Sequence, residues 1–308
     1  MVEETQVIGP PRLPALTWAE RRDLLLFQVL RRLPVAWVSQ VGAHLGQVLG
    51  RRAHPAAADR VRRALVHLFP ALSAEPAAVS ASAHRVWENV GRVYAEFCVL
   101  ERIGGGGDRI VVDNAAVLED VLHADRPVII TYVHLGNWEA CGMDLARRAP
   151  GRLFAFAAPL PANRARARIA AMQRGRAAAS VITTDRMAWR HALDRLEQPG
   201  GIFYVAVDEV TDSSVAVPAF GRPLQARGNL GKVVRLAART GAIILPIYSE
   251  RLPDARFRTC VLQPMKFARG VTLDETALYQ RIAHLDGQYA PVVLRLAEQW
   301  FGLLDLRP

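Results

Sequence analysis

Short runs of apolar, β-branched or aromatic residues alternate with segments of helical apolar spacing over the last two thirds of the chain. The runs at residues 128–132, 153–157, 201–207 and 242–248 contain few polar side chains, which is typical of strands buried on both faces of a sheet. A further run at 256–262 is a candidate for an additional strand. Buried strands that alternate with helices indicate an α/β protein. We therefore predict a central, mixed and largely buried sheet flanked by helices.

Helical spacing of apolar residues predicts the remaining elements. The clearest amphipathic pattern covers residues 229–239, where Lys232, Arg235 and Arg239 lie opposite an apolar face. Further helices are predicted at residues 56–69, 80–100, 274–289 and 291–304.

The N-terminal third contains helical patterns only, so the chain divides into a helical region at residues 1–103 and an α/β domain at 108–308. The glycine run 104–107 separates the two. It is not a nucleotide-binding loop, because Arg109 stands where such a loop needs a further glycine. We interpret the run as a turn and expect the two parts to pack as one continuous structural unit.

The most apolar stretch lies near the N-terminus, at residues 24–30 and 33–49. No charged residue occurs between Arg32 and Arg51, but polar side chains and glycines make the stretch marginal for a membrane-spanning helix. Flanking arginines predict a helix that lies in a membrane surface among anionic head groups. A helical hairpin buried against the core is the alternative. The first 14 residues lack a signal-peptide pattern, so we expect the protein at the cytoplasmic face of the inner (plasma) membrane.

The chain carries a formal net charge of +10, and of its 39 basic residues only Lys232 and Lys266 are lysines. Such an arginine excess favours anionic partners, because guanidinium binds phosphate and carboxylate groups through two parallel hydrogen bonds. We find no nucleic-acid-binding motif, and aromatic residues make up only 7% of the chain. A membrane surface, an anionic glycolipid or an acidic carrier protein is therefore a better candidate partner than nucleic acid.

The cysteines Cys98, Cys141 and Cys260 are far apart and show neither a CxxC pair nor zinc-ligand spacing. This pattern favours a reducing compartment, and it predicts no disulfide framework and no metal site.

A reactive residue follows the first predicted strand, where a turn leads into a helix. His134 ends the strand and Glu139 falls in the first helical turn. A neutral imidazole accepts a proton near neutral pH, and a carboxylate on its far nitrogen fixes the tautomer and stabilises the imidazolium. We therefore predict a general base at His134 with Glu139 as its partner. The alternative is that His134 only caps the helix.

The string His-Leu-Gly-Asn-Trp-Glu at residues 134–139 resembles the HX4(D/E) motif of the lysophospholipid acyltransferase superfamily. The residues of this string are most similar to those of the bacterial lipid A biosynthesis (HtrB-type late) acyltransferases. Residues 236–246 resemble that family's Leu-Ala-x-x-Thr-Gly-Ala-x-x-x-Pro signature, and Glu298-Gln299-Trp300 resembles its terminal Glu-Gln-Trp. The resemblance extends over nearly the whole chain.

The resemblance implies acyl transfer from an acyl carrier protein thioester, or from acyl-CoA, to a hydroxyl group of an anionic glycolipid. A lipid A precursor is the first candidate acceptor. No metal and no organic cofactor is implied. By position in the family, His134 and Glu139 are catalytic, and the substrate-binding candidates are Asn137, Asn163, Arg174 and Asp208.

The sequence departs from the family where the acceptor is expected to bind. Ala158-Pro159-Leu160 replaces a Tyr-Arg-Pro, and Gly302-Leu303-Leu304-Asp305 replaces a basic tail. These departures leave a mannosylated phosphoinositide or a lysophospholipid open as acceptor. A non-catalytic lipid-binding protein with the same fold is the alternative of a different class.

Overall fold

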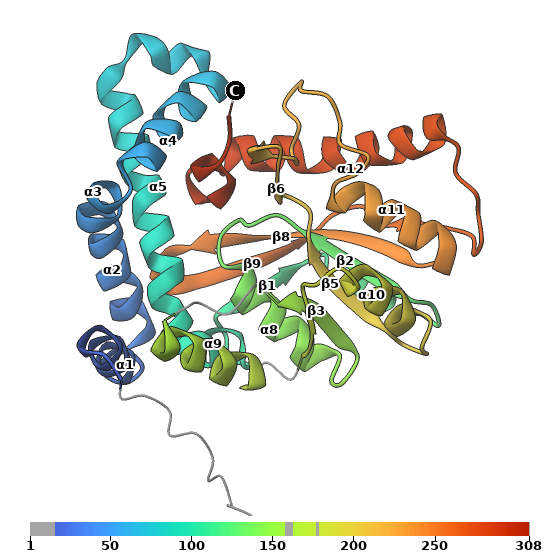
Figure 1. Ribbon diagram of the computed structural model, residues 1–308, viewed down its shortest axis with the longest axis horizontal. Coiled ribbons are helices and arrows are strands. Elements are labelled where there is room, and N and C mark those ends of the chain that lie inside the picture. The colour runs from blue at the N-terminus through green and yellow to red at the C-terminus, as the bar shows by residue number, and fades with distance from the viewer. Residues whose placement is uncertain (1–15, 158–162, 177–178, 308) are drawn as a thin grey trace, which may run out of the picture.

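A largely parallel sheet forms the centre of the computed structural model, which describes residues 16–157, 163–176 and 179–307 (Figure 1). Its strands are β1 (Ile110–Asp113), β2 (Val128–Tyr132), β3 (Leu153–Ala157), β4 (Ser180–Thr183), β5 (Ile202–Ala206), β8 (Ile243–Leu252), β9 (Arg256–Val261) and β10 (Met265–Lys266). They lie in the order β1-β9-β8-β2-β5-β3-β4, with β10 also paired to β8. Strand β8 runs antiparallel to β9 and β10, while the other neighbours are parallel. The predicted mixed sheet is confirmed.

Helices cover both faces of this sheet, because each strand alternates its side chains between them. The helices are α1 (Trp18–Leu30), α2 (Val35–Leu45), α3 (Arg51–Ala53), α4 (Pro55–Leu68), α5 (Pro76–Glu96), α6 (Leu100–Gly104), α7 (Ala115–Leu122), α8 (Trp138–Arg148), α9 (Arg164–Arg176), α10 (Ala188–Leu196), α11 (Asn229–Thr240) and α12 (Glu275–Arg295). On β2, Ile129 packs in one core with side chains of α10, α11 and α12. Val128 and Ile130 pack in a second core with α7 and α8. Figure 1 shows α11 and α12 above the sheet and α8 below it.

The predicted helix at residues 291–304 is wrong. Instead, α12 continues through Pro291 to Arg295, and short 3-10 turns follow at Ala297–Gln299 and Phe301–Leu304. The buried Val292 and Val293 keep the apolar face of α12 against the core beyond the proline, as Tyr289 does before it. This packing outweighs the backbone hydrogen bond that proline cannot donate.

The elements that escape the sequence analysis include β1, α7, β4 and α10. Strands β1 and β4 are four residues long and lie at the two edges of the sheet. Their apolar runs, Ile110-Val111-Val112 and Val181-Ile182, are only two or three residues long, which is too short for the pattern alone to distinguish a strand.

Helix α2 packs directly on α5, and this contact depends on glycine. A Cβ added to Gly91 would lie 2.1 Å from the Gly42 carbonyl oxygen, and one added to Gly46 would lie 2.1 Å from the Trp87 carbonyl oxygen. Such distances leave no space for a side chain, so the two backbones are in contact. The inner face of α2 is buried through Val35 and Val38.

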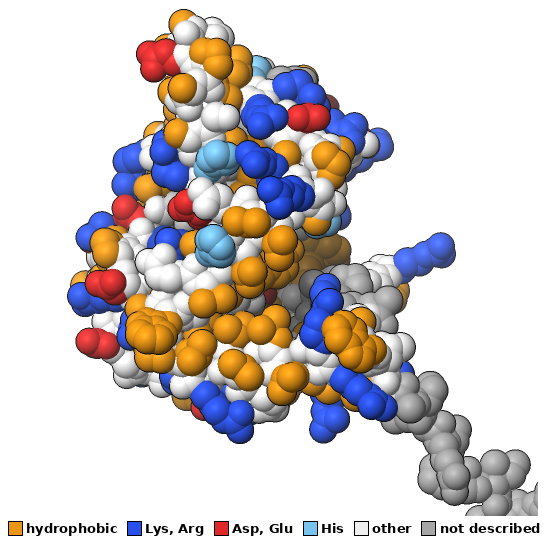
Figure 2. Space-filling view, turned by 90° about the vertical axis from the view of Figure 1, so that its left-hand side faces the viewer, with side chains coloured by type: hydrophobic (Ala, Val, Ile, Leu, Met, Phe, Trp, Pro, Cys, Tyr) orange, Lys and Arg blue, Asp and Glu red, His pale blue; other side chains and the backbone are white. Residues whose placement is uncertain are grey.

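The outer faces of α1, α2 and the π-helical turn that follows α2, Gly46–Gly50, expose large apolar side chains. Trp18 is 77% exposed and Trp37 is 66% exposed, and the same surface includes Leu25, Leu26, Val29, Val41, Leu45 and Leu49. Figure 2 shows apolar side chains gathered over the lower part of this side of the molecule, with basic side chains beneath them. We call these eight residues the apolar N-terminal surface.

Among the helices in the described part of the chain, none combines the length and apolarity needed to cross a bilayer. The predicted association of this region with a membrane surface stays a prediction.

Candidate active site

The parallel pairing of β2 and β5 brings His134 to Asp208. Tyr132, the last residue of β2, is in register with Ala206, the last residue of β5. His134 and Asp208 follow two residues beyond these strand ends. Because both strands run in the same direction, the two side chains lie at the same carboxyl edge of the sheet. His134 Nδ1 is 2.7 Å from Asp208 Oδ1, and the His134 backbone N–H donates to Asp208 Oδ2 at 2.8 Å.

The Asp208 side chain is fully buried, and a third donor fixes it. Trp300 Nε1 donates to Asp208 Oδ2 at 2.9 Å. A carboxylate can only accept hydrogen bonds, so the proton of the short contact lies on His134 Nδ1. In the neutral imidazole, Nε2 is then the nitrogen with a free lone pair.

Three carboxylates raise the pKa of His134. Burial opposes the charged imidazolium, but the charge and the hydrogen bond of Asp208, followed by the charges of Glu139 and Glu209, outweigh it and raise the pKa of His134 above 6.5. The side chain remains 32% exposed, so a substrate can reach the imidazole.

The sequence analysis predicts Glu139 as the carboxylate partner of the His134 ring, whereas the structure places Asp208 at Nδ1. Among the described contacts, the carboxylate bonded to the His134 ring is Asp208. Glu139 lies in the first turn of α8, where its charge raises the pKa of His134 and of the Tyr132 and Tyr204 phenols. Its catalytic role stays a prediction.

Aromatic rings surround the imidazole. The Trp138 ring meets it edge-on with centroids 4.7 Å apart, and Tyr132 lies at 5.6 Å. Tyr132 stacks on Tyr204 at 4.1 Å, and Phe301 packs on Trp138 at 4.8 Å. These rings restrict the positions that the imidazole can adopt.

The turn from His134 to Asn137 is held by the C-terminal segment. The Gly136 N–H donates to the Gln299 carbonyl at 3.2 Å, and the Phe301 N–H donates to the His134 carbonyl at 2.9 Å. Gly136 has φ +65°, and a Cβ there would lie 2.2 Å from the Ser249 carbonyl oxygen. Only glycine fits this turn.

Asn137 is buried, with 1% of its surface exposed. Its Oδ1 accepts the Ala140 N–H at 3.0 Å and caps α8, and its Nδ2 donates to Glu96 at 2.8 Å. Asn137 is a predicted substrate-binding residue, but its side-chain oxygen and nitrogen both form hydrogen bonds within the protein. These bonds indicate that Asn137 positions the turn.

The other two substrate-binding candidates are Asn163, directly before α9, and Arg174, within α9. Asn163 Oδ1 accepts the Arg166 N–H at 3.0 Å, and its Nδ2 donates to Asp23 of α1 at 3.4 Å. Its described contacts therefore join α9 to α1 and do not include the His134 turn. The backbone of Arg174 belongs to α9, but its side chain lies outside the described residues. A substrate contact at either residue stays a prediction.

Glu209 also lies at the site, although the sequence analysis does not name it among the candidate residues. Its Oε1 accepts the Asn229 N–H at the start of α11, and its Oε2 is buried without a hydrogen-bond partner among the described residues. Burial raises the pKa of Glu209 to about 7. The only sequence signal is its place directly after Asp208.

The described residues contain no group of three His, Cys, Asp or Glu side chains arranged to hold a metal ion. The arrangement at His134 is that of an imidazole general base oriented by a buried carboxylate.

The family profile of bacterial lipid A biosynthesis acyltransferases matches residues 16–306. The chain belongs to this family. No curated protein matches the chain. In this lipid A biosynthesis acyltransferase, the matched residues include the strand-ending His134 and its buried partner Asp208. The match also includes the docked C-terminal segment, whose Trp300 bonds Asp208.

Proposed function

We propose that this acyltransferase moves a fatty acyl chain from an acyl carrier protein thioester, or from acyl-CoA, to a hydroxyl group of an anionic glycolipid. A lipid A precursor is the first candidate acceptor. The single observation that carries the chemistry is the His134–Asp208 contact, with Nδ1 and Oδ1 2.7 Å apart. The family and the arginine excess support the acceptor class.

In the proposed reaction, His134 Nε2 removes the proton of the acceptor hydroxyl while the hydroxyl oxygen attacks the thioester carbonyl. The tetrahedral intermediate then collapses, the C–S bond breaks, and the imidazolium returns the proton to the leaving thiolate. Asp208 stabilises the imidazolium between these steps. The ester and the free thiol are the products.

The oxyanion of the intermediate needs hydrogen-bond donors, and the start of α8 is the nearest helix N-terminus. The Gly136 N–H already donates to Gln299 and the Asn137 N–H to Ser249 Oγ at 3.4 Å. The Ala140 N–H is capped by Asn137. Among the described hydrogen bonds none uses the Trp138 N–H at the start of α8, which makes it a candidate donor to the oxyanion.

Mass spectrometry of the products tests the reaction. Purified protein is incubated with acyl carrier protein or CoA thioesters and, separately, with a lipid A precursor, a phosphatidylinositol mannoside and a lysophospholipid. We expect one acceptor to gain one acyl mass with the wild type only, and not with His134→Ala. Absence of an acylated product with every donor and acceptor would favour the non-catalytic lipid-binding alternative.

We also propose that the apolar N-terminal surface lies in the cytoplasmic face of the inner membrane. An exposed apolar area of this extent marks an interaction site, and the neighbouring arginines suit anionic head groups. The acceptor's acyl chains would then stay in the bilayer while its head group reaches His134.

A double charge substitution tests this docking. Trp37→Glu with Leu49→Glu places two carboxylates on the apolar N-terminal surface, and we expect co-sedimentation with anionic phospholipid vesicles to fall at least about tenfold, given the cost of burying charge. Met187→Glu with Val271→Glu is the matched control, because these exposed apolar residues lie outside that surface. Equal binding by both variants and the wild type would exclude the proposed surface.

A further inference from the structure

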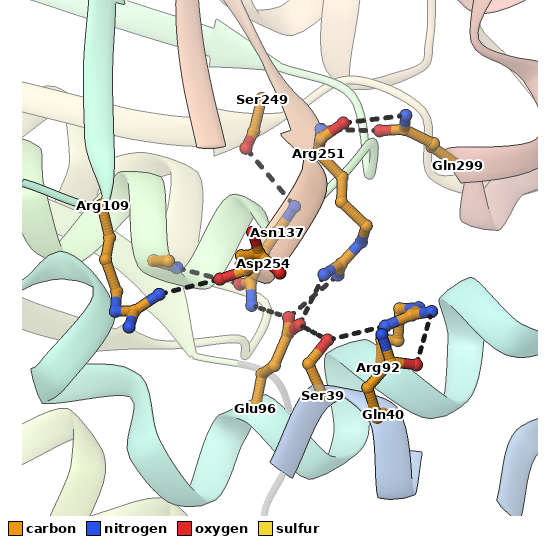
Figure 3. Close-up of polar contacts among 11 residues, drawn as sticks. Ser39, Gln40, Arg92, Glu96, Arg109, Asn137, Ser249, Arg251, Asp254 and Gln299 are labelled. Carbon is orange, nitrogen blue, oxygen red and sulfur yellow. Dashed lines mark hydrogen bonds and ion pairs between the residues drawn. The ribbon is translucent and has the colours of Figure 1, made fainter. Parts of the chain in front are cut away.

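Glu96, at the end of α5, is a fully buried carboxylate that joins three parts of the protein (Figure 3). Ser39 of α2 donates to its Oε1 at 2.7 Å, and Asn137 Nδ2 donates to its Oε2 at 2.8 Å. Both oxygens also accept from Arg251 of β8, one of them at 2.9 Å. Each oxygen of Glu96 therefore accepts two hydrogen bonds, and the bond that Asn137 donates to Oε2 comes from the turn that carries His134.

Arg251 reaches the same turn by a second route. Its backbone N–H donates to Gln299 Oε1 at 2.7 Å, and its carbonyl accepts from Gln299 Nε2 at 3.3 Å. The Gln299 carbonyl in turn accepts the Gly136 N–H. Figure 3 shows the Arg251 side chain extending from its strand to Glu96, with Gln299 beside the Arg251 backbone. Glu96 thus bonds the turn that carries His134 directly at Asn137, and the backbone of its ion-pair partner Arg251 contacts the turn at Gly136 through Gln299.

Stability alone does not account for such a pair. Removing two charges from water costs several kcal/mol per ion, and replacing a buried ion pair with apolar residues is often neutral or stabilising. A buried pair does impose a specific geometry, because every group bonded to it must remain in place. In this protein the groups held in place are Ser39 of α2 and Asn137 of the turn that carries His134.

We propose that Glu96 is a positioning residue for acyl transfer, which together with Arg251 holds Asn137 and Gln299 and thereby keeps His134 against Asp208. The proposal rests on the proposed function, in which His134 is the general base. The charged groups that face His134 are Asp208, Glu139 and Glu209, and Glu96 acts on the imidazole only through the turn.

The variant Glu96→Gln tests the proposal. We expect kcat to fall by about 10²-fold, the cost of a misplacement of roughly 1 Å. KM should be unchanged, because Glu96 is buried and touches no substrate. The acid limb of the pH profile should move to lower pH, because the Asp208 contact that raises the pKa of His134 is loosened. A loss of folded protein alone would lower activity equally at every pH.

Asp144→Asn is the matched control. Asp144 is a buried carboxylate on α8 that pairs with Arg147 at 2.8 Å and Arg148 at 2.7 Å, at the far end of the helix from the turn. We expect this variant to lose stability and to keep the wild-type acid limb. A double-mutant cycle of Glu96→Gln with Asn137→Ala should show non-additive losses in kcat, because one residue acts through the other.

If Glu96→Gln does not fold, Glu96→Met with Arg251→Met removes both charges and keeps similar volume, which a buried pair often tolerates. A folded variant of either kind with wild-type kcat and acid limb would overturn the proposal. If the wild type itself transfers no acyl group, the proposed function fails instead. If the wild type is active, His134→Ala is inactive and the Glu96 variants match the wild type, only the positioning role is refuted.

Discussion

Replacing His134 with alanine should lower kcat by about 10²- to 10⁴-fold, the range that a positioned general base contributes. The variant loses the nitrogen that accepts the acceptor proton, while the turn keeps its backbone bonds to Gln299 and Phe301. Donor KM should change little, because the substrate-binding surfaces are retained. Initial rates of acylated product formation, measured by mass spectrometry, give both constants.

His123→Ala is the control for this variant, because His123 is an exposed histidine at the end of α7 and bonds only Glu119 among the described residues. It should retain wild-type activity. If His134→Ala kept more than about a tenth of the wild-type rate, the general-base role would be refuted.

Replacing Asp208 with asparagine should have the second largest effect, a loss in kcat on the order of 10²- to 10⁴-fold. The substitution preserves the shape of the side chain. However, an amide has only one acceptor oxygen, so its NH₂ group cannot accept the second of the hydrogen bonds that His134 and Trp300 donate to Asp208. The proton can then move to Nε2, where the imidazole no longer acts as a base. Steady-state rates across pH measure this loss.

The pH dependence of kcat/KM gives an independent test of the Asp208 contact. The imidazole is active when neutral, so activity rises with pH as His134 loses its proton, with a midpoint above 6.5 in the wild type. Asp208 raises this pKa through its charge and its hydrogen bond, so Asp208→Asn should move the acid limb to lower pH. The comparison variant is Glu139→Gln, which removes a nearby charge without a described hydrogen bond to the imidazole. A larger loss in kcat for Glu139→Gln than for Asp208→Asn would restore Glu139 as the main partner of His134.

Local patterns were sufficient to predict most of the central sheet and the strand-turn-helix unit around His134. The apolar run at 128–132 and the helical spacing after Glu139 reflect interactions within a few residues of each other, and β2 and α8 have nearly those bounds. The pairing of His134 with Asp208 depends instead on which strands are neighbours. Residues 74 positions apart meet because Tyr132 lies in register with Ala206, and no periodicity in the sequence encodes that register.

The remaining site residues show the same limitation. Trp300 and Gln299 are recognisable in the sequence only as part of a terminal motif, yet one bonds Asp208 and the other holds Gly136. Glu96 resembles any charged residue on an amphipathic helix, although it is fully buried. Its burial is possible only because Arg251, 155 positions away, provides the opposite charge.

The glycine contact between α2 and α5 would also fix the orientation of the enzyme on a membrane that contains its substrate. The two helix backbones are in contact at Gly42, Gly46 and Gly91. Helices α2 and α5 can therefore tilt only together, and Glu96, the last residue of α5, moves with them. If the apolar N-terminal surface binds a membrane as proposed, the distance from the bilayer surface to His134 would then be fixed by the fold, and lipids whose reactive hydroxyl lies at another depth would not reach His134.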